Sequence, residues 1–227
     1  MKNLRILCMA LLFSAMPSMA QEGNMTVELE TFEEIKVFDQ INVTLVKSDE
    51  NKAVVSGDDA QEVSIDNDNG RLKIKMEADN FLDGNDTNVV LYYTNDLSLV
   101  DANEGAKITS EDDLESKYLT VRSQEGGKII IGVNARNLDS KAVTGGEITI
   151  SGSAENQDVN IRSGGQYNAE KLSSNQTDVT ILAGGKAMVN VSDFVDANVT
   201  AGGTIEIYGN PETVKEDKTL GGSIILK

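Results

Sequence analysis

Pairs of adjacent glycines recur at nearly equal intervals through the second half of this sequence. Successive pairs start 19, 19, 20, 18 and 19 residues apart, at Gly126-Gly127, Gly145-Gly146, Gly164-Gly165, Gly184-Gly185, Gly202-Gly203 and Gly221-Gly222. Gly105-Ala106 extends the series one step upstream. Isolated glycines are ordinary, but six pairs in register indicate a repeat protein whose unit is one turn of a coil.

The residues that flank each glycine pair alternate between polar and apolar. The first residue after the pair is polar in every repeat, as in Lys128 and Glu147. The second and fourth can face a core in every repeat: Ile129 and Ile131, Ile148 and Ile150, Tyr167 and Ala169, Ala187 and Val189, Ile205 and Ile207, Ile224 and Leu226. This period of two predicts a β-strand with one buried face. A second short strand is expected before each pair, followed in the repeat by a polar connection such as Ala154 to Asp158.

A unit of this length cannot bury its own apolar face, so it must stack on copies of itself. We therefore predict an all-β fold, a right-handed single-stranded parallel β-helix with rungs of about 19 residues. Glycine suits the corner because the chain turns sharply there and can require a positive φ, and because side chains would press on neighbouring rungs. The same spacing makes Tyr167 a core residue rather than a ligand-binding one.

The amino-terminal third is strand-like but less regular. Apolar residues alternate from Ile35 to Leu45 and again from Leu72 to Met76, and Asp66 to Gly70 reads as a hairpin turn between strands at 63–65 and 72–74. We expect 21–227 to form a single β-helix domain, with 21–103 as irregular first rungs and a cap, and 104–227 as the regular Gly-Gly rungs.

Residues 1–20 have the layout of a secretory signal peptide. Lys2 and Arg5 precede an apolar run, and Pro17 and small residues follow it. The run is too short to span a bilayer, which takes about 20 residues. The single cysteine, Cys8, lies within this run and lacks the small residues expected before a lipidated cysteine. The protein is thus expected to be exported, to the periplasm, the outer-membrane surface or the medium, and to fold without disulfides.

The charge balance is strongly acidic. The formal net charge is -17, and removal of Lys2 and Arg5 with the signal peptide would make it -19 over 207 residues. Charge of this sign repels phosphate backbones, so nucleic-acid binding is not expected. The sequence also offers no integral membrane segment after the signal peptide.

Composition narrows the chemistry. The chain has no histidine and no cysteine besides Cys8, which excludes Ser-His-Asp and Cys-His nucleophilic systems and the usual zinc sites. A polysaccharide lyase or glycosidase built on carboxylates stays open as an alternative. The outward positions beside the Gly-Gly corners, however, show no repeated aspartate and no clustered arginine. We therefore expect a protein that is not an enzyme, and assign no catalytic, cofactor-binding or metal-binding residue and no cofactor.

Two weaker patterns in the sequence bear on ligand binding. Asp66, Asp68 and Gly70 resemble the start of an EF-hand loop, and Asp83-Gly84-Asn85-Asp86 and Asp58-Asp59 also offer oxygen ligands for calcium, but solvated turns explain all three. Tyr92-Tyr93, Tyr118 and Tyr208 could stack on sugars, although aromatic residues make up only 4% of the chain.

Several short patterns together resemble one family. They are Phe38-Asp39-Gln40-Ile41-Asn42-Val43, Asn69-Gly70-Arg71-Leu72-Lys73-Ile74, Tyr208-Gly209-Asn210-Pro211 and Gly221-Gly222-Ser223-Ile224. In order and spacing they are similar to the auto-transporter adhesin, head GIN domain family, from about Thr31 to the end. The resemblance implies an exported right-handed β-helix of Bacteroidota-type bacteria, and it assigns no catalytic residue.

The function expected from all this is that of a noncatalytic, adhesin-like binding or structural module of the cell envelope. Its partner would be a glycan or an envelope protein. A self-assembling scaffold, joined through the open ends of the β-helix, is the second alternative beside the polysaccharide-acting enzyme.

Overall fold

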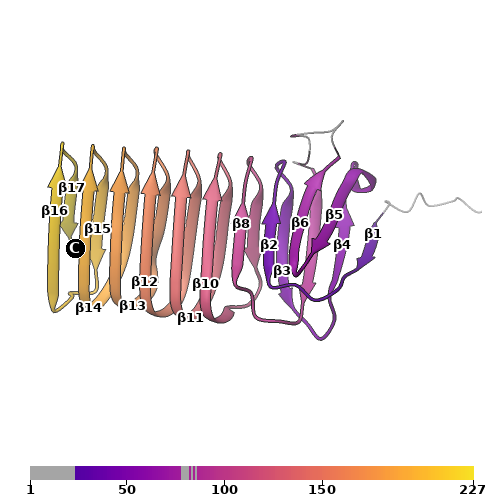
Figure 1. Cartoon of the computed structure of the whole chain (residues 1–227), viewed down its shortest axis with the longest axis horizontal. Coiled ribbons are helices and arrows are strands. Elements are labelled where there is room, and N and C mark those ends of the chain that lie inside the picture. The colour runs from indigo at the N-terminus through magenta and orange to yellow at the C-terminus, as the bar shows by residue number, and fades with distance from the viewer. Residues whose placement is uncertain (1–23, 78–81, 83, 85) are drawn as a thin grey trace, which may run out of the picture.

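The computed structural model describes residues 24–77, 82, 84 and 86–227, so the predicted signal peptide lies outside the described residues. The chain forms an all-β solenoid of about seven turns with parallel rungs of about 19 residues, which confirms the predicted fold class. Figure 1 shows the rungs stacked along one axis, with narrow corners along the upper edge and broad bends along the lower edge.

The regular part of the solenoid begins after residue 113. Its strands are β10 (Leu114–Gln124), β11 (Lys128–Val143), β12 (Glu147–Arg162), β13 (Gln166–Leu182), β14 (Lys186–Thr200), β15 (Thr204–Tyr208), β16 (Thr213–Thr219) and β17 (Ser223–Leu226). From β11 to β14 each strand makes a whole turn, because its two halves lie on opposite faces of the solenoid and join through the broad bend.

The predicted polar connections are not loops. Residues 154–158 lie within β12 and residues 173–178 within β13. The strand continues because backbone pairing between rungs persists through the bend, and polar side chains stack there as well. Asn156 Nδ2 donates to Asn137 Oδ1 at 3.1 Å, and Arg136 pairs with Glu155 at 3.2 Å. Stacked polar side chains thus satisfy one another at the bend.

Each narrow corner uses its two glycines for different reasons. At Gly164 the φ is +79° and a Cβ would meet nothing within 4 Å, so only the left-handed backbone favours glycine there. Gly165 lies so close to the previous rung that a Cβ would be 2.2 Å from the carbonyl oxygen of Ala142. The residue before each pair is also left-handed, as at Ser163 (φ 50°), a feature that the sequence does not reveal.

The core fills the space between the two faces. The inward positions predicted from the alternation are buried from Ile129 to Ile207, whereas Ile224 and Leu226 in the last rung are partly or largely exposed. Tyr167 is 1% exposed, as predicted, and its hydroxyl donates to Gln157 Oε1 at 2.7 Å. Gln157 Nε2 in turn donates to Ser174 and Thr177, each at 3.2 Å. A small polar network therefore lies inside the core.

The amino-terminal part has shorter strands and mixes parallel with antiparallel pairs. Its elements are β1 (Met25–Glu28), β2 (Glu34–Val37), β3 (Asn42–Lys47), β4 (Lys52–Ser56), β5 (Val63–Asp68), β6 (Arg71–Met76), β7 (Asn88–Tyr93), β8 (Leu99–Ala102) and β9 (Lys107–Ser110), with one short 3-10 helix, η1 (Ala60–Glu62). β5 and β6 form the predicted antiparallel hairpin. β1 and β4 add further antiparallel pairs at this end.

Rung order departs from chain order in this region. β2 pairs in parallel with β6 and β8, and β3 pairs in parallel with β7 and β9. The turn formed by β2 and β3 is therefore inserted between two turns that follow it in the sequence. Figure 1 shows β2 lying between β6 and β8.

The opposite end of the solenoid carries charges at inward positions. In β16, Glu216 pairs in register with the buried Ala197, and Lys218 with the buried Val199. These two side chains form an ion pair of 3.3 Å. Charged residues that point inward on an edge strand discourage further strand pairing.

Candidate functional site

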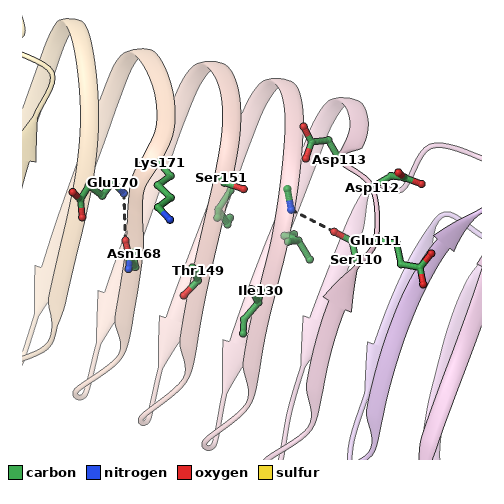
Figure 2. Close-up of a pocket in the computed structure, with 13 residues that line it drawn as sticks. Ser110, Glu111, Asp112, Asp113, Ile130, Thr149, Ser151, Asn168, Glu170 and Lys171 are labelled. Carbon is green, nitrogen blue, oxygen red and sulfur yellow. Dashed lines mark hydrogen bonds between the residues drawn. The ribbon is translucent and has the colours of Figure 1, made fainter.

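A groove of about 430 Å³ lies on the face formed by the first halves of β11, β12 and β13 (Figure 2). Its floor consists of outward side chains of β11 and β12, among them Ile130, Thr149 and Ser151. One wall is the segment 110–113 between β9 and β10. The other is formed by Asn168, Glu170 and Lys171 of β13.

A β-bulge in β13 produces the second wall. Thr149 pairs with Asn168 and Ser151 with Lys171, so one residue of β12 lies opposite two residues of β13. Towards β14 the pairing jumps from Ala169 to Ser173. The extra residues leave Glu170 and Lys171 exposed beside the floor. Bulges commonly re-aim side chains next to functional sites.

Glycine allows the first wall to close over the floor. Gly132 is an interior residue of β11, and a Cβ there would lie 1.8 Å from the Oδ1 atom of Asp113. The Gly132 N–H donates to Ser110 Oγ at 3.3 Å. Glycine within a strand often marks such a close approach. The carboxylate of Asp113 thus lies directly above the floor.

The groove carries charges of both signs. Gly132, Ser151 and Lys171 occupy one register column across three successive rungs. Asp113 covers the Gly132 end of this column, and Lys171 forms the other end. Figure 2 shows Ser151 between these two side chains. The arrangement can hold a polar ligand through a carboxylate, a hydroxyl and an ammonium group.

The opposite face carries a ladder of aspartates that the sequence analysis missed. Asp139, Asp158, Asp178 and Asp196 pair in register on four successive rungs. The sequence analysis considered only the positions next to the corners, which carry no repeated aspartate, and therefore did not cover this ladder. The signal was present, since each aspartate precedes a Gly-Gly pair by six residues.

Neighbouring aspartates of the ladder change the pKa of Asp158. Burial raises the pKa of the Asp158 carboxyl above its ordinary value, and the charges of Asp139 and Asp178 raise it further, against a hydrogen bond from Asn160. Asn160 Nδ2 donates to Asp158 Oδ1 at 2.6 Å. Like charges opposite one another in a sheet are destabilising. The ladder therefore costs stability at neutral pH.

The calcium-like patterns of the sequence occupy separate places. Asp66 and Asp68 lie on β5, and Gly70 lies in the hairpin turn that follows. Asp58 and Asp59 precede η1, whereas Asp83 and Asn85 lie outside the described residues. Among the residues that the structure describes, no three His, Cys, Asp or Glu side chains are grouped so as to hold a metal ion.

The tyrosines do not form a common platform. Tyr93 and Tyr167 are buried, while Tyr118 is 66% exposed on β10. Tyr208 lies on β15, where its hydroxyl donates to Glu206 at 3.2 Å. Lys52 Nζ covers the ring of Tyr92 at 4.9 Å from the ring centre. None of these residues lines the groove.

Residues 31–211 match the model of the family described as "Putative auto-transporter adhesin, head GIN domain". The chain belongs to this family. The resemblance stated from short sequence patterns is thereby confirmed. No curated protein matches the chain.

Solved structures similar to this head GIN domain protein come from Bacteroidales. A "putative adhesin" of Bacteroides fragilis has a TM-score of 0.82 at 17% identity, covering 90% of this chain and 96% of that one. A "putative adhesin" of Parabacteroides merdae has a TM-score of 0.69 at 16% identity, covering 90% and 95%. A "putative lipid binding protein" of Parabacteroides distasonis has a TM-score of 0.67 at 14% identity, covering 90% and 96%. At these identities the likeness shows the fold.

Proposed function

We propose that this head GIN domain protein is a noncatalytic, exported binding module of the cell envelope, and that its ligand lies in the β11–β13 groove. The groove is the main support for the proposal, because the regular repeat is interrupted there. Positions that recur in every rung are explained by stacking, whereas the bulge at Glu170 and Lys171 has no such role. The adhesin description of the family supports export and binding.

Electrostatics favours a ligand without net negative charge. The chain has a formal net charge of -17, and the groove adds three carboxylates at 111–113 and a fourth at Glu170 against the single Lys171. A polyanion would be repelled over a distance of about a Debye length, roughly 8 Å at physiological salt. Neutral or zwitterionic envelope components fit better. Within the described residues, no helix has the length and apolarity to cross a membrane.

The two alternative functions have less support. A lyase or glycosidase needs cooperating carboxylates or a metal site, and the family and neighbour descriptions name adhesins. End-to-end assembly would require open edges, but the β16 edge carries the inward Glu216 and Lys218. The family and neighbour descriptions and the charged β16 edge therefore favour a binding module that does not assemble end to end.

The test is retention of an envelope ligand by protein with an open or a filled groove. Thr149→Trp places a large side chain on the groove floor, and Thr180→Trp is a matched control on the opposite face. Immobilised proteins would be offered fractionated envelope extracts and a glycan array. We expect one component to bind the wild type and Thr180→Trp but not Thr149→Trp. Equal retention by all three proteins would refute the groove as the binding site.

Release of reducing or unsaturated ends from neutral and acidic polysaccharides, with and without calcium, would contradict the noncatalytic part of the proposal. The same assay on Thr149→Trp would then show whether the groove is responsible. We expect no release by either protein.

A further inference from the structure

Two opposite charges of the groove have no ion-pair partner among the described residues. In the part of the chain that the structure describes, neither Asp113 nor Lys171 takes part in an ion pair, although charges elsewhere pair between rungs. Lys128 and Glu147, for example, lie 3.1 Å apart in adjacent rungs. Asp113 and Lys171 are instead separated by the rungs of Gly132 and Ser151. Both therefore remain available to a ligand.

The spacing of the rungs limits the size of a matching ligand. Successive rungs are about 4.8 Å apart, so the Cα atom of Gly132, beneath Asp113, lies roughly 10 Å from the Cα atom of Lys171. The flexible lysine side chain can turn its ammonium group towards Ser151. A charge-assisted hydrogen bond at each end takes about 2.8 Å. A ligand whose own charges lie about 4–5 Å apart can then contact both groups. This is the distance across a two-carbon link between an ammonium group and a phosphate or carboxylate.

We propose that the groove binds a compact zwitterion, with its primary ammonium group on Asp113 and its phosphate or carboxylate group on Lys171. The inference rests on the proposed binding function of this groove and names its ligand class. Ser151, midway along the column, presents a hydroxyl to the link between the two charges. Such a ligand is neutral overall, so the net charge of -17 does not repel it.

Ammonium chemistry makes the site selective. Asp113 accepts hydrogen bonds, and a primary ammonium group offers three N–H donors. A quaternary ammonium group offers none, and none of the described residues that line the groove is aromatic and could bind it instead. Ethanolamine-type groups are therefore favoured over choline-type groups. The same ethanolamine phosphate chemistry can come from a lipid headgroup or from a substituent on a glycan.

The probe is glycerophosphoethanolamine, a phosphodiester that is neutral overall, titrated into the isotope-labelled protein and followed by NMR at the Gly132 amide. Ethanolamine and dimethyl phosphate serve as half-ligands and should each bind at least about tenfold more weakly, because each keeps one charged contact. Half-ligands that bind as tightly as the zwitterion would overturn the inference.

Charge variants distinguish specific contacts at Asp113 and Lys171 from an effect of the protein's net charge. Asp113→Asn and Lys171→Gln change the net charge in opposite directions, yet each should weaken binding about tenfold because each removes one charged contact. Asp139→Asn and Lys141→Gln make the same changes outside the groove and should leave binding unaltered. The exchange Asp113→Lys with Lys171→Asp should recover binding with the zwitterion reversed. Opposite effects of the two single variants would instead indicate the overall field and refute the site.

Vesicles identify the source of the zwitterion. Sedimentation with phosphatidylcholine vesicles containing phosphatidylethanolamine, compared with phosphatidylcholine alone, reports a lipid headgroup if binding requires Lys171. Binding of free glycerophosphoethanolamine without vesicle binding supports a soluble or glycan-borne group. If glycerophosphoethanolamine fails to bind while Thr149→Trp still abolishes retention of an envelope component, the zwitterion is wrong and the proposed function stands. If Thr149→Trp changes nothing, the proposed function itself fails.

Discussion

The two glycines of one corner should respond very differently to alanine. At Gly164 an added Cβ meets nothing within 4 Å, so Gly164→Ala imposes only the left-handed backbone at φ +79°. This costs about 1 kcal/mol after the stiffer unfolded chain offsets part of it. At Gly165 the added Cβ would lie 2.2 Å from the oxygen of Ala142 and 2.6 Å from its carbonyl carbon. One backbone segment must then move by about 1 Å to reach ordinary contact.

That movement disturbs one hydrogen bond within the corner and one to the next rung. The Gly165 N–H donates to the Arg162 carbonyl at 3.2 Å, and the Gly165 carbonyl accepts from Lys186 at 3.1 Å. Overpacking together with one or two weakened bonds costs about 3–4 kcal/mol. For a chain of this size, Gly164→Ala should lower the melting temperature by about 2–4 °C and Gly165→Ala by about 6–16 °C.

Thermal and urea unfolding followed by circular dichroism would measure both variants. Gln166→Lys, at the exposed position beside the corner, is the control and should stay within about 0.5 kcal/mol of the wild type. Gly145 and Gly146 repeat the contrast one rung earlier, because a Cβ on Gly146 would lie 2.1 Å from the oxygen of Ser123. Equal losses at the two members of a pair, or a larger loss at the first, would refute the assignment of separate roles.

Three further predictions follow from other parts of the solenoid. Asp158 has a folded pKa above its unfolded value of 3.8, so its penalty is complete above the folded pKa and disappears as pH falls towards the unfolded value. Asp158→Asn should thus raise the melting temperature at pH 7 by about 1–4 °C, and this gain should vanish below pH 3.8. An equal gain at the two pH values would show that the charge of the ladder is not the cause. Replacing Glu216 and Lys218 together by valine should let the β16 edge associate, seen as a rise of molar mass with concentration in light scattering, whereas unchanged mass would show that other features block this end. Tyr167→Phe leaves Gln157 Oε1 without its donor and should cost about 1–3 kcal/mol in urea unfolding; a neutral result would mean that the buried network repacks.

Features that repeat could be predicted from the sequence, because stacked rungs need the same kind of residue at the equivalent position of each repeat. The glycine register and the alternation beside it predicted the solenoid and the buried Tyr167, and the turn pattern from Asp66 to Gly70 predicted the hairpin of β5 and β6. The corner residue before the glycines could not be found, since Glu125, Thr144, Ser163 and Ala183 share no chemistry, only a left-handed φ. The inserted β2–β3 turn was also hidden, because local patterns carry no information on which strands pair over 60 or more residues.

The groove shows why a site on a repeat protein is hard to read from one sequence. Its sign was a spacing of 20 instead of 19 residues between Gly164 and Gly184, a deviation that a corner or a loop could equally absorb. Only the register shows that the extra length becomes a bulge at Glu170 and Lys171. The carboxylate opposite comes from Asp113, which lies outside the repeat pattern and reaches the floor because Gly132 lacks a side chain. A bulge alone would leave a lysine on a surface, and an acidic corner alone would be a solvated turn. Because the Asp113 side chain lies over Gly132, the carboxylate and Lys171 stand on either side of Ser151, and the two ends of the groove differ in charge, which regular stacking cannot supply.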